Sequence, residues 1–121
     1  SIYKFGTYTV RAKEEEEAKR LIEDAKILEE SGCFALVLEK IPAKLAEQVA
    51  KSIAIPVIGI GAGSGVDGQV LVTHDMLGMT HEFSPRFLRR YLNLYESMSG
   101  AFQQYIKDVK SKDFPNESEQ Y

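Results

Sequence analysis

Two short runs of consecutive apolar residues most constrain how this 121-residue chain can fold. They are residues 33–38 (CFALVL) and residues 55–60 (IPVIGI), and neither alternates apolar with polar residues. Such a run is typical of a strand buried on both faces, as in a parallel sheet covered by helices. Pro56 near the start of the second run is compatible with a strand, because proline is tolerated at that position.

Segments with helical spacing surround the two runs. Residues 13–30 carry apolar residues three and four apart, and the glutamates at 14–17 fall in the expected first turn, where the helix dipole favours negative charge. Gly32 is a suitable C-terminal cap. A second helix is predicted over residues 43–52, with Pro42 in its first turn. Further along, the pattern predicts a short strand over 69–73, a helix containing 87–95 that ends at Gly100, a helix over 101–110 and a polar tail over 111–121.

The resulting order is strand, helix, strand, helix, strand, with short connections. Such alternation predicts an α/β fold with a parallel sheet, in which helices connect successive strands. In these sheets and in closed β/α barrels, chemistry takes place at the carboxyl ends of the strands. Two candidates fall there: Glu39 after the first strand, and the glycine-rich segment 61–65 after the second.

Composition excludes several function classes. The chain has 15 Lys and Arg against 18 Asp and Glu, a net charge of −3, so it lacks the basic stripe of nucleic-acid binders. No apolar run approaches the roughly 20 residues of a membrane span, and residues 1–4 do not resemble a signal peptide. The single cysteine, Cys33, excludes an internal disulfide framework and favours a reducing compartment. We therefore expect a cytoplasmic, globular chain with no nucleic-acid or membrane partner.

Glu39 is the most informative single residue. A carboxylate that directly follows six apolar residues is poorly hydrated unless it faces a cleft, and burial would raise its pKa toward that of a general base. The alternative is a structural role, in which Glu39 pairs with Lys40 or Lys44 or interacts with the start of the next helix. The position alone leaves both readings open.

The glycine-rich segment does not match a nucleotide-binding motif. Residues 59–65 read GIGAGSG, which fits G-x-G-x-x-G in no register and lacks the Gly-Lys-Ser/Thr ending of a P-loop. No clear helix opens directly after it to supply a dipole for phosphate. The glycines more plainly allow a sharp turn and a close approach to a ligand or to a neighbouring strand.

Other polar residues have ordinary structural explanations. His74 and Asp75 would lie on opposite faces of a strand, and His74 and His81 lack the spacing of a helical zinc site, so we interpret His74 as a structural hydrogen-bonding group. Cys33 opens a buried strand, where cysteine acts as a small apolar residue. The three arginines would form the polar face of the helix expected there: Arg86, Arg89 and Arg90.

Several motifs along the chain occur together in a recognisable order. They are Phe5-Gly6 with Tyr8 and Val10, residues 36–39 (LVLE) with Pro42, residues 55–63 (IPVIGIGAG), residues 67–72 (DGQVLV), His74-Asp75 with Leu77-Gly78, Pro85 with Phe87, and Phe114-Pro115. This set resembles the C-terminal half of the ketopantoate hydroxymethyltransferase family. The departures from the family pattern lie beside the motifs: Thr7 and Ala12 stand for glycine, Arg11 for glutamine, and Lys40-Ile41 for a commoner Cys-Val.

The resemblance implies a fold and a reaction. The family has a (β/α)₈ TIM barrel of the phosphoenolpyruvate mutase and isocitrate lyase type. It transfers a one-carbon unit from 5,10-methylenetetrahydrofolate to 3-methyl-2-oxobutanoate, which gives 2-dehydropantoate for pantothenate and coenzyme A synthesis. A Mg²⁺ ion chelates the oxoacid, and a carboxylate base, which aligns with Glu39, removes a proton to form an enolate. Metal stabilisation of the enolate together with a tuned base is chemically reasonable.

The same resemblance implies that residues 1–121 form the C-terminal part of one barrel domain. A whole barrel takes about 250 residues, so we expect the N-terminal half, with the Mg²⁺ ligands, on a separate or missing segment. No metal ligand or folate-binding residue is therefore assigned in this chain. The resemblance also implies a homo-oligomer, often a decamer. The alternatives are another 2-oxoacid lyase or mutase of this barrel group, and a non-catalytic α/β ligand-binding module.

Overall fold

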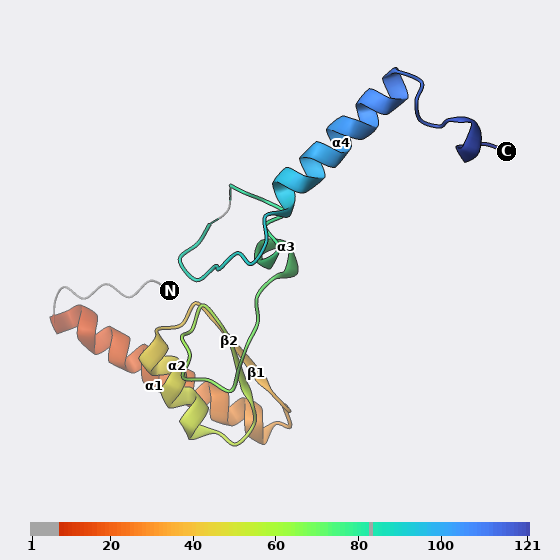
Figure 1. The fold of residues 1–121 in the computed structure, drawn as a ribbon. Coiled ribbons are helices and arrows are strands. Elements are labelled where there is room, and N and C mark those ends of the chain that lie inside the picture. The colour runs from red at the N-terminus through yellow and green to blue at the C-terminus, as the bar shows by residue number, and fades with distance from the viewer. Residues whose placement is uncertain (1–7, 83) are drawn as a thin grey trace. The chain divides into compact units, whose positions relative to one another are not determined.

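The computed structural model of the chain describes residues 8–82 and 84–121. The chain divides into two compact units, Ser1–Leu71 and Val72–Tyr121 (Figure 1). The first unit contains the sheet, and the second contains a long loop and a long helix. The Phe5-Gly6 motif and Thr7 fall outside the described residues, whereas Tyr8 already lies in a helix.

The first helix, α1, spans Tyr8–Glu30 and is longer than the predicted 13–30. The four glutamates at 14–17 consequently do not lie in its first turn, contrary to expectation. Its C-terminal end follows the prediction: Gly32 has a φ of 99°, its N–H donates to the Glu29 carbonyl at 3.0 Å, and the Cys33 N–H donates to the Leu28 carbonyl at 3.1 Å. This pair of bonds is a Schellman motif, which ends the helix.

Three parallel strands in the order β1-β2-β3 form the sheet, which confirms the predicted mixed α/β fold. Strand β1 (Leu36–Glu39) pairs with β2 (Val57–Ile60), with Leu36 opposite Val57 and Glu39 opposite Ile60. The third strand, β3, spans only Gly68–Gln69, so the predicted strand over 69–73 shares just Gln69 with it, and Thr73 already begins a helix. The crossover helix between the first two strands, α2, spans Ala43–Ser52 as predicted, although Pro42 is its N-cap and does not lie in its first turn.

The hydrophobic core lies between one face of the sheet and the two helices. Leu36, Leu38 and Val57 are buried there, and α1 and α2 supply the facing apolar residues (Figure 1). On the opposite face of β1, Val37 is 64% exposed. Burial on both faces was therefore a wrong expectation for this chain by itself, because no described helix covers the second face.

Polar side chains hold the amino ends of the strands. The Glu29 carboxylate accepts hydrogen bonds from the N–H groups of Ala54 and Ile55, at 2.5 and 3.0 Å, and so ties the end of α1 to the approach to β2. The Asp67 carboxylate accepts a bond from the Val57 N–H at 2.8 Å, which joins the segment before β3 to the start of β2.

The second unit differs most from the sequence predictions. Its first helix, α3 (Thr73–Met76), is a single turn, so His74 and Asp75 lie on a helix and not on a strand. The sequence predicted a helix over residues 87–93, but these residues are not helical. Their backbone bonds elsewhere: the Tyr91 N–H donates to the Met76 carbonyl at 2.8 Å, and the Leu94 N–H to the Leu77 carbonyl at 2.9 Å. These bonds close residues 79–90 into a loop.

Helix α4 (Leu94–Lys110) then runs without interruption through Gly100, so the predicted break there is wrong. A glycine inside a helix costs only about 1 kcal/mol relative to alanine and does not by itself end the helix. The tail begins on the end of α4, where the rings of Phe114 and Tyr105 are in edge contact at 5.7 Å. A 3-10 turn, η1 (Glu117–Glu119), follows. Within the described residues, no helix is long and apolar enough to cross a membrane.

The Glu29 contact predicts a measurable loss of stability. Glu29→Gln replaces the charged acceptor that two backbone donors share, and we expect it to lower the free energy of unfolding by about 1–2 kcal/mol. The matched control is Glu30→Gln on the same helix turn, where the side chain is exposed. Urea denaturation of the purified protein measures both variants, and equal losses in the two would contradict a specific role for Glu29.

Candidate functional site

The carboxyl ends of β1 and β2 form the candidate site. Glu39 is the last residue of β1, directly opposite Ile60, the last residue of β2. The Lys40 N–H donates to the Ile60 carbonyl at 2.9 Å and adds one more bond to the ladder. Glu39 and the start of the glycine-rich segment thus lie at the carboxyl ends of neighbouring strands, as the strand order predicted.

Glu39 lies on the sheet face that the helices leave uncovered. Side chains alternate along a strand, so Glu39 shares this face with Val37 and with the half-buried Ile58 and Ile60. The Glu39 side chain is exposed in this chain, so the burial that would raise the pKa of a general base is not seen here. Glu39 is exposed because no described helix covers this face of the sheet. No ion pair joins Glu39 to Lys44 within the described residues.

The glycine-rich segment packs against helix α2. A methyl group on Gly63 would lie 2.5 Å from the Cβ of Ala43, and one on Gly65 would lie 2.8 Å from the Cβ of Glu47. Gly63 also has a φ of 81°, which other residues rarely adopt. These glycines therefore allow a close approach to a helix, where the sequence led us to expect a ligand or a strand.

Gln69 holds the same segment from the other side. Its Nε2 donates a hydrogen bond to the Gly63 carbonyl at 2.8 Å, and in the ladder it stands opposite Gly59. Sequence reasoning missed this residue, because a glutamine in a short strand gives no signal of a loop contact. The segment is thus fixed by packing on α2 and by a side-chain hydrogen bond from β3.

One carboxylate beside this loop has a shifted pKa. The Lys51 ammonium, one helical turn along α2, hydrogen-bonds the Glu47 carboxylate at 2.9 Å and lowers the pKa of Glu47 through that bond and its charge. A lowered pKa means that the charged form of Glu47 stabilises the fold at pH values above the ordinary pKa of glutamate. This contribution is lost as the pH falls through the lowered pKa of the folded state. Because water and salt screen this exposed pair, it contributes only weakly to the stability of helix α2.

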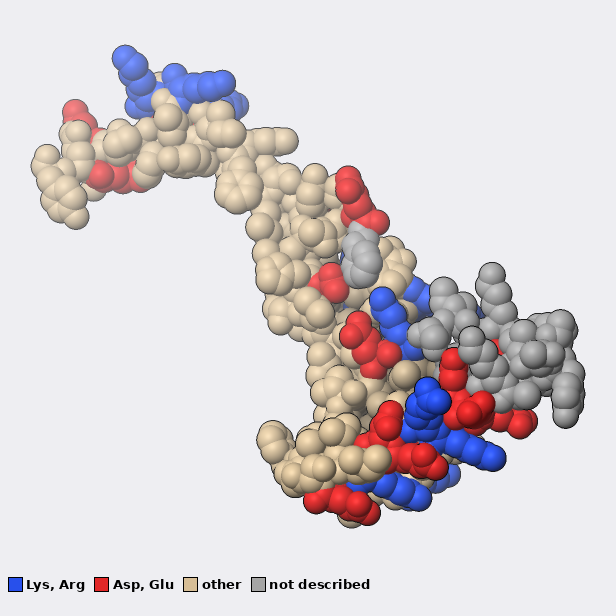
Figure 2. All heavy atoms as spheres, turned by 180° about the vertical axis from the view of Figure 1, so that it is seen from behind, with Lys and Arg blue, Asp and Glu red and all other residues tan. Residues whose placement is uncertain are grey.

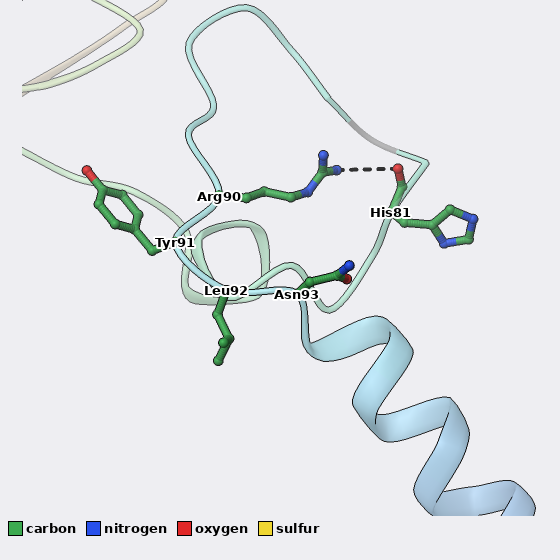
Figure 3. A pocket seen from close by; sticks show the side chains of 5 residues that line it. All are labelled: His81, Arg90, Tyr91, Leu92 and Asn93. Carbon is green, nitrogen blue, oxygen red and sulfur yellow. Dashed lines mark hydrogen bonds between the residues drawn. The ribbon is translucent and has the colours of Figure 1, made fainter.

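The second unit contains an open hollow of its own. It has a volume of about 370 Å³ and is lined by His81, Arg90, Tyr91, Leu92 and Asn93 (Figure 3). The Arg90 guanidinium points toward His81 and donates to its backbone carbonyl at 3.4 Å and to the Thr80 carbonyl at 3.2 Å. Arg90 therefore fixes the loop, and it is not on the polar face of a helix as the sequence predicted.

The remaining candidates do not form a cluster. The His74 ring is exposed and makes no hydrogen bond within the described residues, so the structural bond expected for it is not seen. Cys33 is half-buried and packs against the core, as predicted for a small apolar residue. Among the described residues, no group of three or more His, Cys, Asp or Glu side chains could hold a metal ion.

One face of the first unit carries charge of both signs. On the face seen in Figure 2, acidic and basic side chains are interspersed over the helices of this unit. Mixed charge of this kind lacks the single-sign field that steers a polyanion to a surface.

The fold and the strand ends define an α/β protein whose candidate site lies at the carboxyl edge of a parallel sheet. A family model described as ketopantoate hydroxymethyltransferase matches residues 1–117. The match covers nearly the whole chain, so the chain belongs to this family.

Curated relatives carry the corresponding enzyme name. The 3-methyl-2-oxobutanoate hydroxymethyltransferase of Flavobacterium johnsoniae is 76% identical over 121 residues, that of Parabacteroides distasonis 74%, and that of Christiangramia forsetii 73%. Each match covers 100% of this chain and 44% of the relative. The chain thus spans less than half the length of these relatives.

The packing of the glycine-rich segment predicts a large effect of one methyl group. Gly63→Ala combines an unfavourable φ with overlap against Ala43, and we expect a loss of about 2–4 kcal/mol in the free energy of unfolding. Gly100→Ala is the control: it meets nothing within 4 Å, and an alanine inside a helix stabilises by about 0.5–1 kcal/mol. Thermal unfolding compares the two, and a neutral Gly63→Ala would contradict the packing.

Proposed function

We propose that this chain is the C-terminal part of a hydroxymethyltransferase that converts 3-methyl-2-oxobutanoate to 2-dehydropantoate, with 5,10-methylenetetrahydrofolate as the one-carbon donor. This reaction belongs to pantothenate and coenzyme A synthesis. Family membership over residues 1–117 supports the reaction class. The single observation that supports the site is the placement of Glu39 as the last residue of a parallel strand.

Glu39 is the proposed general base. Its carboxylate takes the proton from the third carbon of the oxoacid, and the C–H electron pair moves into the enolate. The enolate carbon then bonds to the folate-borne methylene carbon, the bonds from that carbon to the folate nitrogens break so that tetrahydrofolate leaves, and one water supplies the hydroxyl of the new hydroxymethyl group. A base must reach the proton it removes, and the exposed Glu39 side chain lies at the strand end with no covering element among the described residues.

The uncovered sheet face supports a larger barrel. Parallel sheets are buried on both faces, yet β1 here presents Val37 to solvent, and β1 and β3 each have an edge that pairs with no described strand. We propose that residues 1–121 are the C-terminal part of one (β/α)₈ barrel of the phosphoenolpyruvate mutase and isocitrate lyase type. The N-terminal half, on a separate or missing segment, would cover this face.

Magnesium is the proposed cofactor of the complete enzyme. The described residues do not fit a Mg²⁺ site by themselves, because they bring no three carboxylate or histidine side chains together. We therefore place the Mg²⁺ ligands in the N-terminal half and assign none of them here. The complete enzyme is further proposed to be a cytoplasmic homo-oligomer, such as a decamer, that acts on small molecules.

Barrel closure predicts the hydrogen exchange of two amides. The N–H groups of Leu36 and Lys40 donate to carbonyls of the β2 segment, so those of Val37 and Glu39 point to the other edge of β1. If another strand pairs there in the complete protein, both amides exchange slowly, like the core. Exchange of Val37 and Glu39 at the rate of unpaired amides would contradict the closed barrel. Leu38 serves as the internal control for a paired amide.

Removal of the base predicts a loss of proton exchange. In the complete enzyme, Glu39→Gln keeps the size of the side chain but cannot accept the proton, and we expect exchange at the third carbon of the oxoacid to slow by about 10²–10⁴-fold. Proton NMR in deuterated water measures this step without folate. Glu30→Gln, an exposed glutamate at the end of α1, is the control. Unchanged exchange in Glu39→Gln would remove Glu39 from the role of base.

Product analysis separates the alternatives. Exchange at the third carbon that is not followed by folate-dependent formation of 2-dehydropantoate would favour another lyase or mutase. Binding of the oxoacid with no exchange at all in the unaltered complete protein would favour a non-catalytic binding module.

A further inference from the structure

Lys40, directly after Glu39, has a left-handed backbone that its amino-acid type does not favour. Its φ is 52°, and the other described non-glycine residue with a positive φ is Lys112, at 63°. At Lys112 a helix cap explains the conformation, because the Asp113 N–H donates to the Asp108 carbonyl at 2.9 Å across the end of α4. No helix ends at Lys40, so its conformation needs another explanation.

The neighbouring strand turns at the same level. Gly61 follows Ile60 with a φ of 66°, so both strands change direction directly after the last pair, Glu39 opposite Ile60. Glycine adopts this conformation without steric cost, whereas lysine adopts it only at a steric cost. A disfavoured conformation persists only where its surroundings enforce it, and such residues concentrate at functional sites.

A hydrogen bond and the start of the next helix constrain the turn at Lys40. The Lys40 N–H donates to the Ile60 carbonyl at 2.9 Å, and two residues later Pro42 stands at the N-cap position of helix α2. The chain must therefore turn from strand to helix within Lys40 and Ile41. Because Lys40 takes up the turn, Glu39 keeps its place in the ladder and its side chain stays on the uncovered face with Val37 and Ile60.

We propose that Lys40 is a positioning residue for Glu39, and that it acts through its left-handed backbone. This inference rests on the proposed role of Glu39 as the base. The backbone conformation at position 40 fixes where the strand ends and therefore where the Glu39 carboxylate is held relative to the substrate. The ammonium group of Lys40 is not required for this role.

Two matched variants of the complete enzyme test the inference. Lys40→Asn and Lys40→Val both remove the ammonium, but asparagine tolerates the left-handed region and a β-branched valine does not. We expect Lys40→Val to lower kcat for proton exchange at the third carbon by about 100-fold, since a small misplacement of a catalytic group costs about that much. KM is expected to stay unchanged, and Lys40→Asn to exchange at nearly the unaltered rate.

Three results would overturn the inference. Equal loss of exchange in both variants would assign the effect to the ammonium. Unaltered kcat in Lys40→Val, with only a lower melting temperature, would show a purely structural role. A rise in KM in place of a fall in kcat would show a role in substrate binding. If Lys40→Val does not fold, Lys40→Leu, which tolerates the region better, takes its place with the same expected direction.

A different measurement, proton exchange in Glu39→Gln, tests the proposed function itself. If Glu39→Gln exchanges the proton at the unaltered rate, Glu39 is not the base, whatever Lys40→Val does. If Glu39→Gln loses exchange and Lys40→Val keeps it, the base stands and the positioning role of Lys40 is overturned.

Discussion

The parallel pairing of β1 with β2 is the interaction on which the rest of the first unit depends. It places Leu36 and Val57 on one face, where α1 and α2 bury them, and it brings Glu39 level with Ile60 at the carboxyl edge. A shift of one residue would turn Glu39 toward the helices and expose the core leucines. The register thus decides both the burial of the core and the position of the candidate base.

The two ends of the sheet have different roles. At the amino ends, the carboxylates of Glu29 and Asp67 accept backbone hydrogen bonds and fix how the strands begin. At the carboxyl ends, Glu39 is exposed and the backbone turns through Lys40 and Gly61. The division is typical of parallel α/β folds, in which one end supports stability and the other supports chemistry.

Local patterns predicted the elements that pack against the core. Helix α2 has the predicted bounds, 43–52, because its apolar stripe meets the sheet directly. The predicted helix over 87–95 is helical only at its last two residues, because the N–H groups of Tyr91 and Leu94 donate to the carbonyls of Met76 and Leu77. Spacing of apolar residues does not reveal such bonds. The low helix propensity of glycine also led to a wrong prediction that a helix ends at Gly100, which lies inside α4.

Runs, spacing and motifs along the chain were enough to predict the α/β order, the place of Glu39 at the end of a strand, and the family. The packing of the glycine-rich segment on α2, the hydrogen bond from Gln69 and the left-handed turn at Lys40 became visible in the folded chain alone. They arise where separate segments of the sequence meet in space. The local preferences of lysine and glutamine do not indicate such a contact.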